Sequence, residues 1–333
     1  MNLCGDWHEG IARIRCSDCG YDFFVPFSCK SFFLCPSCGQ KRNLLLGEYM
    51  SKDLLLQLPH RQFVWTIPWC LRVFLKHNRE LHAELRRLIF TLLGQYFSEA
   101  TGRDITTGMV SSLQTFGEYA SWNPHWHTIV LEGGFDRHDK FFFIPIGASE
   151  ELSELWRREV IGFFVSKGLV NANFAISLLG WRHSGFSIES GTRIYDERAR
   201  ESLSQYIVRA PVYLEKLYWD NETDTVVWSA PKKGLFRGED RYFSGPDFIA
   251  QVTLHIPDKG KHLVRRYGVY FSRSRGTWKN RKALMLRAPV NWYGFAIAER
   301  PSGCETAEAG AVTVPACRKA WELSKKSVSR NSS

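Results

Sequence analysis

His125 and His127, separated only by Trp126, are the side chains of this sequence best placed to bind one metal ion together. They lie in residues 123–131, a stretch rich in β-branched and apolar residues that predicts a strand. Side chains on a strand alternate between its two faces, so both imidazoles should project to one side, and Trp126 and Val130 to the other. Two imidazoles on one face can chelate a cation, although two ordinary histidines on a polar face would give the same pattern.

A third metal ligand would come from the preceding predicted strand, residues 108–117. Gln114 is the first candidate and Glu118 the second. Two histidines with a neutral oxygen donor leave coordination positions for phosphate oxygens and water. This donor set suits Mg²⁺ or Mn²⁺ acting as a Lewis acid.

The cysteines near the N-terminus predict a structural zinc site. Two C-x2-C pairs with 15 residues between them fall within the spacing of zinc modules, and buried free thiols would rarely be paired in this way. A module of about 40 residues can hardly fold without its metal. Cys4, His8 and Cys29 lie in the same segment and could form part of a second site or substitute for a ligand. The four ligands predicted from the spacing are Cys16, Cys19, Cys35 and Cys38.

Positive charge is concentrated in one block of the chain. The formal net charge of the 333 residues is +10, and residues 261–290 contain nine basic side chains and no acidic one, interleaved with aromatic residues. Cations bind phosphates and aromatic rings stack on bases, so this block predicts a DNA-binding surface, with a solvated basic face as the alternative. The predicted DNA-binding residues are Lys261, Arg265, Arg266, Arg273, Arg275, Lys279, Arg281 and Lys282.

Composition excludes several other classes of protein. The apolar fraction of 44% is ordinary for a globular chain, and the length favours two domains. No apolar run approaches the roughly 18 residues that a membrane helix needs, and the N-terminus has no secretory signal. We therefore expect a protein of the reducing cytoplasm, with no membrane partner and with nucleic acid as the partner.

The elements that would position these residues follow from hydrophobic periodicity and from turn residues. Strands are predicted at 60–69, 108–117, 125–131, 141–146, 173–179 and 185–189, and a hairpin at 216–230. Helices are predicted at 43–58, 71–99, 150–165, 196–209 and 246–256.

Several short motifs occur in one order along about residues 4–290. They are Cys16-x2-Cys19, Ser28-Cys29, Cys35-Pro-x-Cys38-Gly-Gln40, Phe63-x-Trp65-Thr66-Ile67-Pro68, Leu113-Gln114-Thr115-Phe116-Gly117, Asn123-Pro124-His125-Trp126-His127, Glu132-Gly133-Gly134, Gln205-Tyr206 through Pro211, and His255 through Tyr270. In these motifs the chain resembles the HUH rolling-circle transposases of bacterial insertion sequences, the group with an N-terminal zinc-binding domain.

The resemblance implies an α+β fold in which an antiparallel sheet carries the histidines centrally and helices pack on it. It implies a zinc module over residues 1–45, a catalytic domain over 46–300 and a polar tail over 301–333. The implied activity is transposition by nicking and rejoining single-stranded DNA, including hairpin ends, in the bacterial cytoplasm and at the nucleoid. The oligomeric state stays open.

By the same resemblance Tyr206 is the nucleophile and forms a 5′-phosphotyrosine. A phenol with a pKa near 10 is a better leaving group than an alkoxide, which suits a reversible linkage. Two-tyrosine members carry a second tyrosine four residues earlier, where this chain has Ser202, and this indicates a single-tyrosine variant. Leu34 stands where the family often has a histidine, which favours ligation by cysteines alone.

Two alternatives stay open at this point. One is a plasmid replication initiator or relaxase with the same chemistry, against which the zinc module and the C-terminal motif argue. The other is a non-catalytic, zinc-containing DNA-binding protein.

Overall fold

The computed structural model describes residues 4–31, 33, 35–146, 149–182, 184–194, 203, 211–212, 214–230 and 238–272. Tyr206, the helix predicted at 196–209 except for Leu203, and the tail at 301–333 lie outside these residues. The same holds for Arg273, Arg275, Lys279, Arg281 and Lys282.

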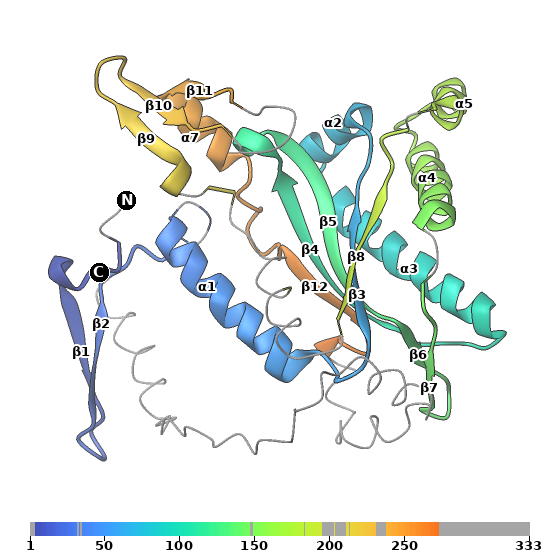
Figure 1. Ribbon diagram of the computed structural model, residues 1–333, viewed down its shortest axis with the longest axis horizontal. Coiled ribbons are helices and arrows are strands. Elements are labelled where there is room, and N and C mark those ends of the chain that lie inside the picture. The colour runs from blue at the N-terminus through green and yellow to red at the C-terminus, as the bar shows by residue number, and fades with distance from the viewer. Residues whose placement is uncertain are drawn as a thin grey trace.

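A five-stranded antiparallel sheet forms the centre of the fold (Figure 1). Its third strand, β5, carries the two histidines, so the predicted central position is confirmed. The mixture of an antiparallel sheet and packed helices confirms the α+β class. The order of strands is β12 (Val264–Gly268), β4 (Gly108–Phe116), β5 (Trp122–Leu131), β3 (His60–Trp65) and β8 (Ile188–Ile194).

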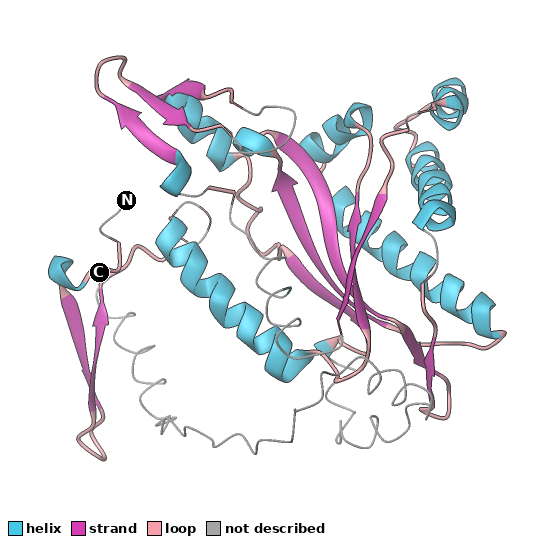
Figure 2. Cartoon of the chain, viewed as in Figure 1, coloured by secondary structure: helices cyan, strands magenta, loops and turns pink. Residues whose placement is uncertain are grey.

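Helices cover one face of this sheet (Figure 2). The main hydrophobic core lies between them and the sheet, and Trp65, Trp126 and Trp156 are fully buried in it. Trp65 packs edge-on against Trp156 and its Nε1 donates a hydrogen bond to Oγ1 of Thr128 at 2.9 Å. The helices that contribute to this core are α2 (Trp69–His77), α3 (Leu81–Thr101), α4 (Ser149–Ser166) and α5 (Ala172–Gly180).

The second face of the sheet is covered only in part. Helix α1 (Pro36–Tyr49) continues into a π-helical turn (Met50–Leu54), whose side chains pack against Val110 and Ile129. Val110 and Ile129 are cross-strand partners, and Ile129 is two residues from His127 on the same strand. Helix α1 therefore lies on the face to which the histidines point.

Smaller units extend from the sheet. A hairpin of β1 (Ile11–Arg15) and β2 (Asp22–Pro26) follows a short 3-10 turn (Trp7–Glu9), and a second hairpin pairs β6 (Gly133–Phe135) with β7 (Phe141–Phe143). The predicted hairpin at 216–230 is confirmed as part of a three-stranded sheet that packs on α7. These elements are β9 (Leu217–Asp220), β10 (Thr225–Trp228), β11 (Arg241–Ser244) and α7 (Gly245–Thr253).

His255 joins this small sheet to the loop between β4 and β5. Its Nδ1 lies 2.9 Å from Oγ1 of Thr115, and its Nε2 donates to the carbonyl of Ala120 at 2.7 Å. Tyr119 and Ala120 both have positive φ, at 52° and 50°, a conformation that non-glycine residues rarely adopt. The buried histidine thus holds a strained turn at the rim of the histidine strand.

Three secondary-structure predictions need correction. The segment predicted as a strand at 173–179 is helix α5, because the Asn171 side chain accepts a hydrogen bond from the Phe174 amide and caps a helix. The helix predicted at 71–99 is two helices that separate at Asn78. The helix predicted from residue 43 begins already at Pro36, directly after Cys35.

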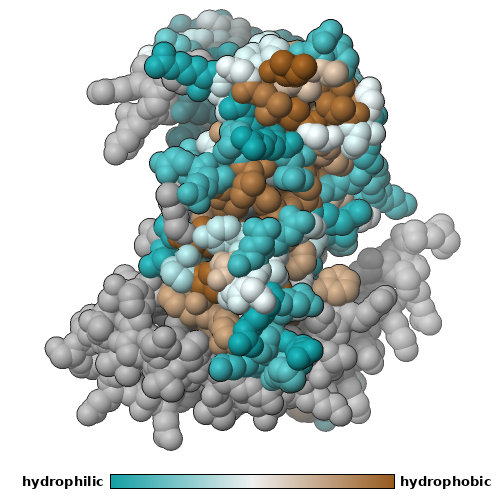
Figure 3. All heavy atoms as spheres, turned by 90° about the vertical axis from the view of Figure 1, so that its right-hand side faces the viewer, coloured by the Kyte–Doolittle hydropathy of each residue, from teal (hydrophilic) through white to brown (hydrophobic). Residues whose placement is uncertain are grey.

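In the described part of the chain, no helix combines the length and apolar character needed to cross a bilayer. Figure 3 shows hydrophobic side chains gathered on the face of α4 and α5, where Leu155, Ile176 and Leu179 are exposed.

Candidate functional site

A cavity of about 450 Å³ opens where β4, β5, β3 and β8 leave the face of the sheet uncovered. His125, His127 and Gln114 all line it, so the three predicted metal ligands share one cavity. Glu118, the second candidate for the third ligand, is exposed and lines the same cavity from the turn after β4. Trp126 and Val130 are buried in the core on the other side, as the alternation predicts.

The two imidazoles are close neighbours. Their ring centroids are 4.9 Å apart and their planes are inclined at 66°. Nδ1 of His125 donates to the carbonyl of Asn123 at 2.7 Å, which fixes the tautomer and leaves the Nε2 lone pair available. Burial, the largest cause, lowers the pKa of His125 and favours the neutral ring that a metal requires.

The neighbouring strands support the pair. Gln114 lies directly opposite His125 in the register of β4 and β5, and Val64 lies opposite His127 across β3. The side-chain amide of Gln62 lies 3.5 Å from Nδ1 of His127. The donor set therefore fits a hard divalent cation such as Mg²⁺ or Mn²⁺, with two imidazoles and one amide oxygen.

Glu189 lines this cavity too and was not found from the sequence. It lies on β8 opposite Val64, so it shares a row of the sheet with His127 although 61 residues lie between them in the chain. A single acidic residue in a short predicted strand carries no signal of its own. Only the pairing of β8 with β3 reveals its place.

A second group of ligands lies at the N-terminus. The sulfur atoms of four cysteines lie within 4.8 Å of one another, with Cys4 and Cys38 at 3.6 Å and Cys29 and Cys38 at 3.8 Å. Zn–S bonds of about 2.3 Å in a tetrahedron place sulfurs about 3.8 Å apart, so the cluster fits one zinc ion. The four residues are Cys4, Cys29, Cys35 and Cys38.

The structure does not bring the two C-x2-C pairs together, contrary to the prediction. Cys16 and Cys19 lie at the closed end of the β1–β2 hairpin, while Cys4 and Cys29 lie at its open end. Four residue steps of extended strand, about 13 Å, separate the two ends. Cys4 and Cys29 therefore take the places assigned to Cys16 and Cys19.

The described part of the basic block is divided between the two faces of the sheet. Arg266 pairs with Val110 on the histidine face and donates to the hydroxyl of Tyr49 at 3.0 Å. Arg265 pairs with Ser111 and points to the opposite face. Lys261 forms an ion pair with Glu80.

Comparison with known proteins agrees with these features. Residues 108–277, just over half of the chain, match the model of a family described as "Putative transposase", and residues 1–67 match the model of the "Transposase zinc-binding domain". The chain is 23% identical over 312 residues to the transposase for insertion sequence element IS801 of Pseudomonas savastanoi pv. phaseolicola. This alignment covers 87% of the chain and 73% of that protein. No solved structure matches the chain. With the zinc-binding region, the histidine strand and the transposase match in one chain, the protein belongs to the HUH rolling-circle transposases of bacterial insertion sequences.

Proposed function

We propose that this transposase nicks and rejoins single-stranded DNA through a 5′-phosphotyrosine on Tyr206. The observation that carries the proposal is the pair of imidazoles, His125 and His127, that face one cavity beside Gln114. Two described residues bracket the tyrosine in sequence and support its assignment. Leu203 packs on the histidine face of the sheet, and Pro211 lines the histidine cavity. Tyr206 lies five residues before Pro211 in the sequence, and five residues of chain span at most roughly 18 Å, which supports the assignment.

The proposed step exchanges one phosphate ester for another. The Tyr206 oxygen attacks the scissile phosphorus, the new O–P bond forms, and the bond from phosphorus to the 3′ oxygen breaks. The phenol loses one proton and the departing 3′ oxygen gains one. Rejoining runs the same step backwards with a 3′ hydroxyl, and because the linkage keeps the bond energy, no nucleotide cofactor is consumed.

His125, His127 and Gln114 are the residues that would hold a divalent metal. A bound Mg²⁺ or Mn²⁺ would supply Lewis-acid polarisation of the phosphate. The hydrogen bond to Asn123 orients the His125 ring before any ligand arrives. Lys216 lines the same cavity and adds positive charge for a phosphate.

The N-terminal cysteine cluster would hold a structural zinc ion. Cys35 precedes the first turn of α1 and Cys38 lies within it, so the ion would join the start of this helix to Cys4 and to the end of the β1–β2 hairpin.

With serine at position 202, one tyrosine must serve both cleavage and transfer, or a second protomer must supply another.

The proposal is tested with single-stranded oligonucleotides from the ends of the element, incubated with the protein and Mn²⁺. We expect a covalent adduct on the 5′ phosphate of the fragment downstream of the cut, and this adduct should disappear in Tyr206→Phe. Tyr218→Phe, an exposed tyrosine on β9, is the matched control and should retain the adduct. An adduct that persists in Tyr206→Phe would exclude this nucleophile. A failure to cleave any end would favour a protein that only binds DNA.

A further inference from the structure

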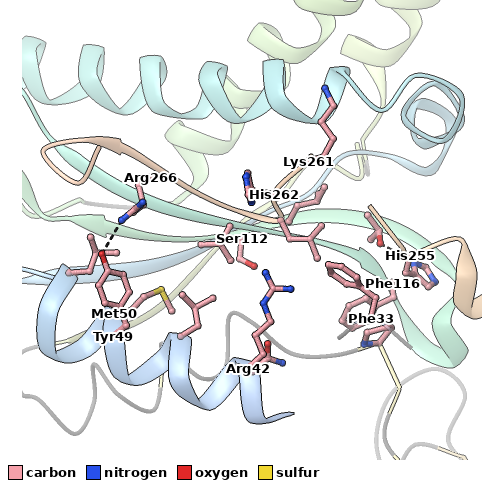
Figure 4. A pocket seen from close by; sticks show the side chains of 18 residues that line it. Phe33, Arg42, Tyr49, Met50, Ser112, Phe116, His255, Lys261, His262 and Arg266 are labelled. Atoms are coloured by element: carbon pink, nitrogen blue, oxygen red, sulfur yellow. Dashed lines mark hydrogen bonds between the residues drawn. The ribbon is translucent and has the colours of Figure 1, made fainter. Parts of the chain in front are cut away.

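A second cavity, of about 420 Å³, lies between helix α1 and the sheet (Figure 4). Arg42 and Tyr49 line it from α1, and Ser112 and Phe116 from β4. Figure 4 shows Arg42 reaching from the helix toward the sheet. A volume of this size is within the range of small-ligand sites, so the cleft can take a nucleotide.

The charge of this cleft suits a phosphate. None of the described residues that line it is acidic. Three basic residues line it: Arg42, Lys261 and Arg266. The hydroxyl of Tyr49 orients the Arg266 guanidinium, and Lys261 at the rim shares its charge with Glu80. Arg42 and Arg266 therefore provide the positive charge inside the cleft.

The same cleft presents flat apolar surfaces. Phe33 and Phe116 are half-buried and lie at one end of it (Figure 4). The guanidinium carbon of Arg42 lies 5.7 Å from the centre of the Phe33 ring, so the two side chains form a cation–π contact. Proteins bind single-stranded nucleic acid by this combination, because every base can stack on an aromatic face.

The cleft lies next to the histidine cavity. Phe116 and Pro211 line both cavities, so a strand whose phosphate lies at His125 has the cleft as its immediate neighbour. We infer that the cleft binds unpaired nucleotides adjacent to the scissile phosphate, with bases stacked on Phe33 and Phe116 and phosphates bound by Arg42 and Arg266. This inference rests on the proposed single-strand cleavage.

Two residues that line this cleft lie close in sequence to the cysteine cluster. Phe33 lies two residues before Cys35, and Arg42 lies one helical turn after Cys38 on the same side of α1. The N-terminal region thus contributes directly to the surface beside the cutting site.

The test measures binding without cleavage. A fluorescent 12-nucleotide oligothymidine is titrated with Tyr206→Phe protein without added Mn²⁺, at several salt concentrations. Adding Arg42→Gln should weaken binding and lower the slope of log K against log salt by about 0.7, the value for one phosphate contact on a single strand. Lys41→Gln, an exposed lysine of α1 outside the cleft, makes the same charge change and should leave the slope unaltered.

Phe33→Leu tests the stacking separately. It should weaken binding about fivefold or more, in line with the loss of one stacked base. Its zinc content must equal that of the parent, which shows that the neighbouring cysteine cluster is intact. Photo-crosslinking of a bromodeoxyuridine strand should then label peptides from residues 33–49 or 261–266.

The outcomes separate this inference from the proposed function. Equal slopes for Arg42→Gln and Lys41→Gln, with crosslinks confined to other peptides, would overturn the inference while cleavage by the unaltered protein continues. Crosslinks in the cleft together with an absence of any Tyr206 adduct would uphold the binding site and overturn the chemistry.

Discussion

Gln114 of β4 lies directly opposite His125 of β5, and both side chains line one cavity. We predict that Gln114→Ala raises the Mn²⁺ concentration needed for half-maximal cleavage about tenfold or more, because the cation loses an oxygen ligand. Gln114→Glu keeps an oxygen at this position and should restore cleavage. The measurement is the initial rate of oligonucleotide cleavage against Mn²⁺ concentration, and an unchanged Mn²⁺ requirement in Gln114→Ala would remove Gln114 from the ligand set.

The geometry of the cysteine cluster predicts which cysteines the protein needs in order to bind zinc. Cys38→Ser should abolish stoichiometric zinc binding, since Cys38 lies within 3.8 Å of both Cys4 and Cys29. Cys19→Ser, at the far end of the hairpin, should keep one zinc per chain. Metal analysis of the purified proteins decides the question, and loss of zinc in both variants would restore the assignment based on spacing.

The carboxylate of Glu132 stabilises the edge of the sheet. It is fully buried and lies 3.0 Å from the Arg193 side chain and 3.7 Å from that of Arg61. Glu132→Ala should cost about 3 kcal/mol of unfolding free energy, since it removes a buried carboxylate that pairs with two partly buried arginines. Urea unfolding provides the measurement. Glu48→Ala, which breaks an exposed pair with Lys52, should cost less than about 0.5 kcal/mol, and an equal effect of both changes would contradict the role.

His82 makes the fold sensitive to acid. It is buried beside the rings of Trp122 and Trp126, and burial, followed by the charges of Arg86 and Arg79, lowers its pKa to about 3. The folded chain therefore keeps this ring neutral, while the unfolded chain protonates it below about pH 6.5. Stability from this group is present above that pH and is lost, at about 1.4 kcal/mol per pH unit, as the pH falls toward 3.

The prediction is tested by comparing slopes of unfolding free energy against pH. Between about pH 6 and 4, His82→Phe should reduce this slope by about 1.4 kcal/mol per pH unit, which corresponds to one proton. His77→Asn, an exposed histidine at the end of α2, should leave the slope as it is. Identical slopes in the two variants would show that His82 is protonated in the folded protein.

The orientation of the two neighbouring arginines on β12 predicts unequal effects on DNA binding. Arg266→Gln should weaken single-strand binding and flatten its salt dependence, because this side chain lies on the histidine face. Arg265→Gln should have a smaller effect, since it points to the α3 side. Neutralising Arg273 and Arg275 as well should flatten the dependence further. Equal effects of Arg265 and Arg266, measured by salt titration, would indicate long-range attraction without a defined path for the strand.

The geometry of the histidine site could be predicted from the sequence because it depends on one strand. Alternation along β5 is a local property, so His125, His127 and Trp126 took their expected sides. The position of Glu189 in the cavity depends on the pairing of β8 with β3, which no local sequence pattern reveals. Helix α5 was missed for a related reason, since a short apolar run suits a buried strand or a helix equally well. Its helical state depends on the cap at Asn171.

The zinc ligands could be predicted in kind and only in part in identity: Cys35 and Cys38 were predicted, whereas Cys4 and Cys29 were named only as possible substitutes. C-x2-C spacing indicates two turns that can each present thiolates, and it does not say which cysteines meet. The length of the β1–β2 hairpin decides this, because it carries Cys16 and Cys19 away from the start of α1. Cys4 lies far from Cys35 in sequence, and only the fold joins them.

Successive side chains of strand β5 alternate between two faces, so that Trp126 lies in the core while His125 and His127 line the cavity. A single inserted or deleted residue within 122–131 would exchange these sides, placing an imidazole against Trp65 and an indole at the cutting site. Stability and catalysis would be lost in one event, and no second substitution could repair one without the other. The four-residue turn 221–224, which joins β9 and β10, carries no such constraint on length. Tolerance of length change along this chain should therefore be lowest at its centre.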